Sequence, residues 1–202
     1  MKIGEARQIY SAQIKEFQQQ KISLAKQKKD LEHKMNILPD GKEQYANEAA
    51  TLELSYNAVS EKYDEYRNFM EKIMEQHMLL FNAEATKQQG EAMEEYALDQ
   101  VKLMEVARRI GRGDIVPASD EQKLMEYSME LYMSAKNLAM LNELQDKDRK
   151  KHDSLWDDDE EKPDNPDPMD VANDGTLQGA APEIVSAEEV VASAVGDAGS
   201  AV

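Results

Sequence analysis

The chain has 202 residues, no cysteine and a formal net charge of −17. Without cysteine it can form neither a disulfide framework nor a cysteine metal site, which fits a reducing compartment, and we expect a cytoplasmic protein. The negative charge argues against a nucleic-acid partner, because phosphates would be repelled over most of the surface. No stretch approaches the roughly 18 apolar residues that a membrane span needs.

The charge is unevenly distributed along the chain. Residues 152–202 hold 14 Asp or Glu against one Lys, which is −13 of the total of −17. Residues 1–41 are basic, with 8 Lys or Arg against 5 acids, whereas residues 42–105 hold 6 bases against 14 acids. A basic first helix beside an acidic second one favours their pairing through flanking charges.

Two heptad ladders dominate the first half of the chain. The first consists of Ile3, Tyr10, Phe17, Leu24, Leu31 and Leu38. The second consists of Tyr45, Leu52, Val59, Tyr66, Ile73 and Leu80. A turn sequence, Pro39-Asp40-Gly41, separates them, with Asp40 placed to cap the second helix. The pattern predicts a long antiparallel helical hairpin with a coiled-coil seam over residues 1–89.

If the chain reverses near Asp40, facing residues have numbers that sum to about 80. In this register the first ladder faces a second set of residues on the second helix. Each of these residues follows a residue of the second ladder by three or four positions in sequence. The predicted seam therefore joins Ile3 to His77, Tyr10 to Met70, Phe17 to Tyr63, Leu24 to Tyr56 and Leu31 to Ala49.

A second, shorter hairpin is predicted over residues 90–151. Gly90 lies in a polar stretch and predicts a break, kink or weak point over residues 87–91, since glycine costs about 1 kcal/mol relative to alanine inside a helix. Apolar spacing resumes with Met93, Ala97, Val101, Met104 and Ala107. After a loop, Ser119 is placed to cap a last helix over residues 120–147. Its predicted buried stripe is Leu124, Tyr127, Leu131, Ala135, Leu138 and Leu141.

Residues 152–202 read as a disordered acidic tail, because they hold too few large apolar side chains to offset the entropy of ordering. One piece differs from the rest. Ser186-Ala187-Glu188-Glu189 has the pattern of a capping box and leads into Val190 and Val191. This segment is predicted to fold as a short helix on a partner.

Two sites outside the seam have alternative interpretations. Arg108, Arg109 and Arg112 either stabilise the negative end of a helix dipole or bind an anionic partner, such as the chain's own acidic tail. Trp156 precedes an unbroken acidic run, residues 157–161. It either folds back onto the last helix or acts as an acidic-aromatic docking motif for a partner.

Two methionine triplets at helical spacing have two interpretations as well. They are Met70, Met74 and Met78, and Met125, Met129 and Met133. Core or seam filling is one interpretation, and an adaptable peptide-binding groove is the other.

No motif for catalysis or cofactor binding is found in the sequence. The histidines lack the spacing of metal ligands, so His77 is interpreted as a seam residue rather than a ligand. There is no glycine-rich phosphate loop and no nucleophile elbow. We therefore expect a protein that is not an enzyme and holds no cofactor or metal.

In shape and periodicity the predicted architecture resembles the small helical-hairpin escort proteins of bacterial export systems. That resemblance implies a chaperone-like role, whereas the residues themselves favour an adaptor or scaffold. We expect a protein partner that offers a helix or a basic surface, with the acidic tail binding or competing for a basic partner. A self-assembling structural scaffold is the alternative, and a homo-oligomer fits either.

Overall fold

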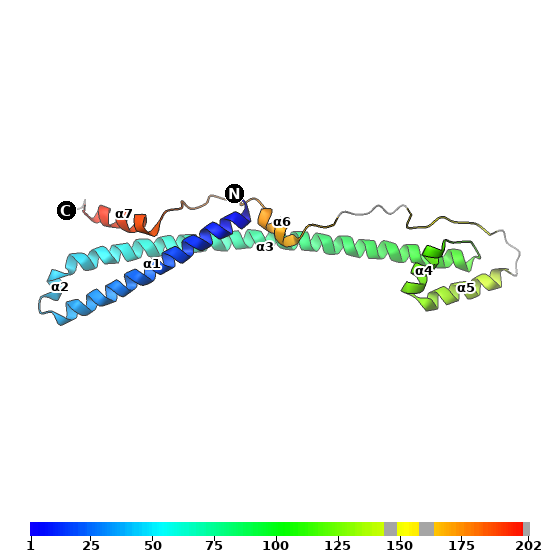
Figure 1. Ribbon diagram of the computed structural model, residues 1–202, viewed down its shortest axis with the longest axis horizontal. Coiled ribbons are helices and arrows are strands. Elements are labelled where there is room, and N and C mark those ends of the chain that lie inside the picture. Colours follow the sequence, from blue (N-terminus) through cyan, green and yellow to red (C-terminus); the bar gives the residue numbers. More distant parts are fainter. Residues whose placement is uncertain (144–148, 158–163, 200–202) are drawn as a thin grey trace. The chain divides into compact units, whose positions relative to one another are not determined.

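The computed structural model describes residues 1–143, 149–157 and 164–199. Its helices in chain order are α1 (Ile3–Ile37), α2 (Gly41–Gln44), α3 (Ala46–Gly111), α4 (Ala118–Tyr127), α5 (Met129–Glu143), α6 (Pro168–Asp174) and α7 (Ala187–Gly199) (Figure 1). Within the described ranges there is no strand, and two isolated bridges pair Lys2 with Thr176 and Ile115 with Lys151. The predicted all-α fold is confirmed.

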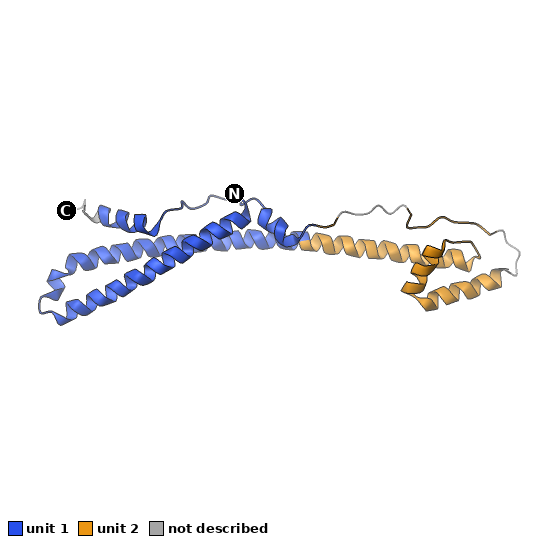
Figure 2. Ribbon diagram, in the orientation of Figure 1, with its two compact units in different colours: residues 1–84, 166–202 blue, residues 85–165 orange. Residues whose placement is uncertain are grey.

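The chain divides into two compact units, coloured separately in Figure 2. Unit 1 combines Met1–Glu84 with Pro166–Val202, and unit 2 is Ala85–Asn165. Helix α3 contributes residues to both units. The C-terminal residues therefore belong to the same unit as the N-terminal helix, although most of the chain separates them in sequence.

The long hairpin of unit 1 is formed by α1 and the first part of α3, as the two ladders predicted. Between them, the short helix α2 starts at Gly41, which is buried. A Cβ atom at this position would lie 2.7 Å from the carbonyl oxygen of Met35, so the turn requires glycine. Asp40 precedes α2, but its side chain makes no capping hydrogen bond. The predicted cap is therefore wrong, because the turn is held by backbone contacts.

Helix α3 runs without interruption through the polar stretch where a break was predicted. Gly90 is helical and exposed, and a Cβ atom there would meet nothing within 4 Å. A single glycine costs only about 1 kcal/mol, and its neighbours in the sequence are good helix formers such as Gln89, Glu91 and Ala92. The division between the units nevertheless falls nearby, after Glu84.

Unit 2 packs a different face of α3 from the one predicted. Met93, Val101 and Met104 are exposed, and the buried residues are instead Leu103, Val106 and Ile110. They form a cluster with Val116, Leu124 and Ala135. This part of α3 carries two apolar faces, and periodicity alone could not tell which of them faces α4 and α5.

The predicted last helix is divided at Ser128 into α4 and α5. The φ of −158° and ψ of 104° at Ser128 end α4, and its hydroxyl then accepts a hydrogen bond from the Leu131 amide at 3.1 Å. Leu124 and Ala135 are buried as predicted, but the corner leaves Tyr127, Leu138 and Leu141 exposed. Ser119 does not cap α4, since its hydroxyl contacts Asp120 instead, 3.1 Å away. Residues 144–147 of the predicted helix lie outside the described residues.

The prediction of a disordered tail is corrected for residues 164–199. Helix α6 begins after Asp167, whose carboxylate accepts the Met169 amide at 2.8 Å. Helix α7 begins with the predicted capping box. The Ser186 hydroxyl accepts the Glu189 amide at 3.2 Å, and the Glu189 carboxylate accepts the Ser186 amide at 3.0 Å. The acidic run of residues 158–161 lies outside the described residues.

Candidate functional site

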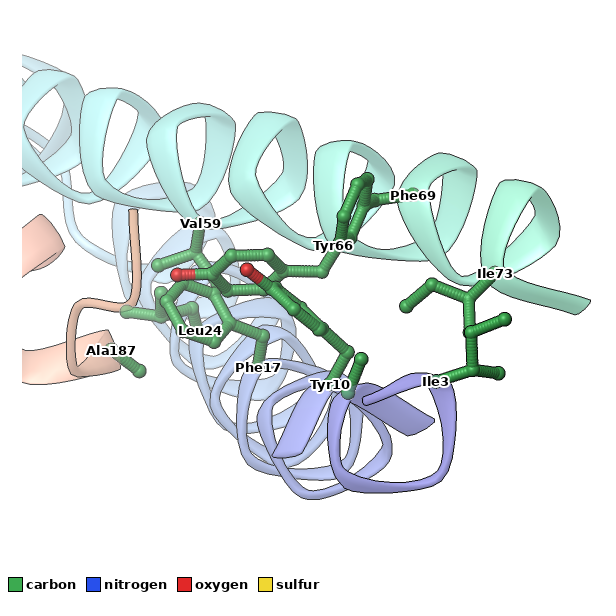
Figure 3. Packing of buried hydrophobic residues seen from close by; sticks show 10 residues of the cluster. Ile3, Tyr10, Phe17, Leu24, Val59, Tyr66, Phe69, Ile73 and Ala187 are labelled. Atoms are coloured by element: carbon green, nitrogen blue, oxygen red, sulfur yellow. The ribbon is translucent and has the colours of Figure 1, made fainter. Parts of the chain in front are cut away.

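The core of unit 1 is built from one ladder on each long helix. On α1, Ile3, Tyr10 and Phe17 are completely buried, and Leu24 and Leu31 are each 4 % exposed. In the part of α3 that belongs to unit 1, the completely buried residues are Val59, Tyr66 and Ile73, which belong to the second ladder itself (Figure 3). Tyr10 packs edge-on against Phe69, and Phe17 packs edge-on against Tyr66, with ring centroids 4.7 and 5.2 Å apart. The residue numbers of these two pairs sum to 79 and 83, close to the predicted sum of about 80.

The seam residues predicted on α3 lie beside this core rather than at its centre. Ala49, Tyr56, Tyr63 and Met70 are half-buried, and only His77 is buried. Lysines of α1 cover the two tyrosines. The Lys21 ammonium lies 5.1 Å from the Tyr63 ring centre and the Lys28 ammonium 4.8 Å from that of Tyr56, in cation–π geometry. The basic first helix thus packs its charged side chains onto the aromatic flank of α3.

The most distinctive site is an extended segment that lies on this hairpin. We call residues 175–186, between α6 and α7, the strap. Its first part pairs with the N-terminus, where the Ile3 amide donates to the Gly175 carbonyl at 2.8 Å and the Leu177 amide donates to the Met1 carbonyl at 3.1 Å. The Gln76 side chain makes two hydrogen bonds to the backbone of Gln178. Its amide nitrogen donates to the Gln178 carbonyl at 2.8 Å, and its amide oxygen accepts from the Gln178 amide at 2.9 Å. Each of these contacts is made by the strap's backbone.

Two buried tyrosines hold the second part of the strap. Tyr10 donates its hydroxyl proton to the Pro182 carbonyl at 2.7 Å, and Tyr66 donates to the Glu183 carbonyl at 2.8 Å. The Tyr66 hydroxyl also accepts the Val185 amide at 3.1 Å. Burial raises the pKa of Tyr10, so its hydroxyl stays protonated and able to donate. The two phenols therefore recognise peptide groups and not side chains.

Helices α6 and α7 anchor the two ends of the strap. Asn173 of α6 accepts a hydrogen bond from Arg7 at 3.0 Å, and its side-chain oxygen lies 3.2 Å from His77 Nε2. At the other end, the amide of the buried Ala187 donates to Glu16 at 2.9 Å. Val190 and Val191 pack against the core of the hairpin, so the predicted short helix lies on its own chain.

An open groove continues along the hairpin beside α7. It has a volume of about 650 Å³, and its apolar lining includes Leu24, Leu31 and Leu52 of the hairpin together with Val191 and Val195 of α7. Val195 is 40 % exposed, so α7 covers this groove only in part.

Unit 2 holds a second segment outside the helices, residues 150–156, which ends in a turn and which we call the clip. Its anchor is Asp120, which is completely buried and accepts from the Ser154 hydroxyl at 2.6 Å and the Leu155 amide at 3.1 Å. Trp156 donates its indole N–H to Asp99 at 2.8 Å. The ammonium groups of Lys123 and Lys102 lie 4.2 and 5.5 Å from the centre of its ring, in cation–π geometry. Trp156 thus contacts its own unit, as the fold-back interpretation expected.

The arginine cluster is placed next to the clip. Arg108 and Arg109 both bind Glu105, at distances from 2.6 to 3.1 Å. Arg109 also donates to the Asp153 carbonyl at 3.4 Å, whereas Arg112 is exposed. Nearby, His152 binds Asp114 at 3.0 Å, and this hydrogen bond lowers the pKa of the Asp114 carboxyl.

The methionine triplets do not fill the core as a whole. Met70 is half-buried, but Met74 and Met78 are 40 % and 53 % exposed. In unit 2, Met129 and Met133 are 56 % and 51 % exposed. Adaptable apolar surface is therefore present on both units.

Comparisons with protein-family models, with curated proteins and with solved structures give no match to this chain. Among the described residues, no helix is long and apolar enough to cross a membrane. The same residues contain no cluster of three or more His, Asp or Glu side chains that could hold a metal ion.

Proposed function

We propose that this protein is a non-enzymatic helical adaptor of the cytoplasm. In this proposal the hairpin face of unit 1 binds an extended segment of a protein partner, and the strap occupies that face until the partner replaces it. The observation that carries the proposal is the pair of buried phenols, Tyr10 and Tyr66, bound to two consecutive carbonyls of the strap.

The chemistry of the strap supports exchange with another polypeptide. Hydrogen bonds to backbone groups are available to any extended chain, so they favour the conformation of the segment more than its sequence. Ile184 is 49 % exposed, and Glu183 is exposed as well, although both lie in the part of the strap that Tyr66 holds. A partner segment with small residues flanking an extended stretch can make the same contacts.

The groove beside α7 offers a starting point for such a partner. Because α7 leaves this apolar groove partly open, a partner can contact the half-buried Leu52 and the exposed side of Val195 before the strap dissociates. Once they leave the hairpin, residues 166–199 present seven acids and no Lys or Arg. In this proposal they contact a basic surface on the same partner, and long-range attraction speeds the encounter.

The test uses a labelled synthetic peptide of residues 175–195 and the full-length chain. Val185→Pro removes the amide that binds Tyr66 and weakens the strap without changing the hairpin face. We expect this variant to bind the peptide about tenfold more tightly than the wild type, as measured by fluorescence anisotropy. Adding Tyr66→Phe should reverse most of the gain, because the phenol is then missing from the receptor.

Ile184→Ala is the matched control, since it changes an exposed side chain of the same strap. It should leave peptide affinity within about twofold of the wild type. Equal affinity for the wild type and for Val185→Pro would show that the strap does not compete for the hairpin face. Chemical crosslinking in native lysate then identifies the partner that Val185→Pro captures more strongly.

A further inference from the structure

In unit 2, α3 carries a second apolar face that the unit does not use. The inner face, Leu103, Val106 and Ile110, packs against α4 and α5. The other face, which we call the outer stripe, consists of Met93, Ala97, Val101 and Met104. Their spacing of four, four and three residues places them on one side of the helix, roughly 140° from the inner face at about 100° per residue.

The outer stripe is open to solvent throughout its length. Met93 and Val101 are each 67 % exposed and Met104 is 54 % exposed. Each residue from 91 to 98 is exposed, so no described part of the chain covers this stretch of α3. Single exposed apolar residues are common on proteins, but a continuous stripe at helical spacing is typical of a helix-pairing surface.

The charges along this part of α3 indicate which partner fits. Residues 85–99 hold four acids and one Lys, which is a net charge of −3. Residues 100–112 hold four Lys or Arg and one Glu, which is a net charge of +3. A second copy that runs antiparallel places each acidic half beside a basic half, whereas a parallel copy places like charges together.

We propose that the outer stripe pairs antiparallel with the outer stripe of a second copy of this chain. The stripe is symmetric about its middle, so Met93 of one copy lies opposite Met104 of the other, and Ala97 lies opposite Val101. The same register places residues 85–97 of one copy beside residues 100–112 of the other, so each acidic half lies beside a basic half. Ala97 is small, which allows the two helices to approach closely.

The first test compares two charge substitutions at positions of equal exposure. Val101→Glu disrupts the outer stripe, whereas Ile22→Glu changes an aliphatic residue of α1 that is 64 % exposed, close to the 67 % of Val101. Sedimentation equilibrium of the full-length chain should show a dimer for the wild type and for Ile22→Glu. Val101→Glu should raise the dissociation constant at least 30-fold with an unchanged circular dichroism spectrum. A monomeric wild type, or equal effects of the two substitutions, would overturn the proposal.

The second test determines orientation and uses the absence of cysteine from the chain. Met93→Cys and Met104→Cys are prepared as separate full-length variants, mixed and oxidised. Antiparallel pairing predicts a disulfide-linked dimer that contains one chain of each variant and little linkage in either variant alone. The two Met93→Cys positions are then roughly 16 Å apart along the helix, at 1.5 Å per residue. Efficient linkage of Met93→Cys to itself would indicate parallel pairing and contradict the proposed register.

Discussion

The Tyr10 and Tyr66 rings pack with their centroids 5.7 Å apart, and their hydroxyls donate to the neighbouring carbonyls of Pro182 and Glu183. One tyrosine comes from each helix of the hairpin. Their rings help to form the core (Figure 3), while their hydroxyls hold the strap. The same pair of residues therefore joins hairpin stability to the binding of an extended segment.

Removing the two hydroxyls should loosen the strap and leave the hairpin intact. The double variant Tyr10→Phe, Tyr66→Phe keeps both rings in the core but loses the hydrogen bonds, each worth about 1 kcal/mol. We expect the amides of residues 175–187 to exchange hydrogen about tenfold faster or more, with the amides of α1 unchanged. Tyr96→Phe, at a residue that is 61 % exposed in unit 2, is the control. Unchanged exchange in the double variant would show that the other contacts, those of Gln76, the N-terminus, α6 and α7, hold the strap without the phenols.

High pH should release the strap through ionisation of Tyr10. Burial raises the pKa of Tyr10 above its ordinary value of 10.0, so its neutral, donating form is favoured in the folded chain. This stabilisation is fully present below about pH 10 and is lost as the pH rises through the raised pKa. The unfolding free energy should therefore fall more steeply above pH 10 in the wild type than in Tyr10→Phe, as urea unfolding followed by circular dichroism would show.

Acid should open the clip of unit 2. The hydrogen bond from His152 is the main cause that lowers the pKa of Asp114 below its ordinary value of 3.8, and the Lys150 amide adds to it. The stabilisation is present above pH 3.8 and is lost as the pH falls through the lowered pKa.

Fluorescence of Trp156, the single tryptophan, reports on the clip directly. Asp114→Asn should abolish most of the acid-dependent change in its emission and shift its spectrum towards that of an exposed indole at neutral pH. Asp170→Asn, at an exposed residue of α6, should behave like the wild type. An identical acid titration in Asp114→Asn would assign the transition to another group.

Two glycines should respond in opposite ways to the same substitution. In Gly41→Ala the new methyl group would lie 2.7 Å from the Met35 carbonyl oxygen, so the turn must shift and unit 1 should lose about 1–3 kcal/mol. In Gly90→Ala the methyl group meets nothing within 4 Å, and the helix should gain about 1 kcal/mol. Urea unfolding of Gly41→Ala should move to lower urea, and amide exchange around residue 90 should slow about fivefold in Gly90→Ala. If Gly41→Ala instead stabilised unit 1, the turn would have room for a methyl group beside the Met35 carbonyl oxygen, contrary to this prediction.

The sequence predicted what depends on local periodicity. Ile3, Tyr10 and Phe17 recur every seven residues, and such a ladder has few ways to be buried other than against a second helix. Periodicity did not decide between rows of similar composition. Val59 and Tyr66 lie deeper than Tyr56 and Tyr63, and the inner face of α3 is buried while the outer stripe is not. That choice depends on which elements pack there, and it is not encoded in a single helix.

The strap could not be predicted in the same way. Its contacts with Tyr10 join residues 172 apart in sequence and are made by backbone groups, which leave no pattern in the side chains. Only Leu177, Ile184 and Val185 carry large apolar side chains between Gly175 and Ala187, so composition indicated disorder, whereas hydrogen bonds to the hairpin supply the missing stabilisation. Only the capping box of Ser186 and Glu189 gave a local signal; the helix was predicted, but on a partner, whereas it lies on its own chain.

The distance in sequence between the hairpin and the strap also sets an order of events during synthesis. Both ladders of the hairpin are complete once Leu80 has been added, and about 100 residues separate it from the middle of the strap. At ~5–20 residues per second, the ribosome needs ~5–20 s to make that interval. Each newly made chain therefore has Tyr10 and Tyr66 before it has the segment that covers them. Under the proposed function, a partner recruited to the nascent chain would meet the hairpin face without a competitor, whereas one that arrives after release would have to displace the strap.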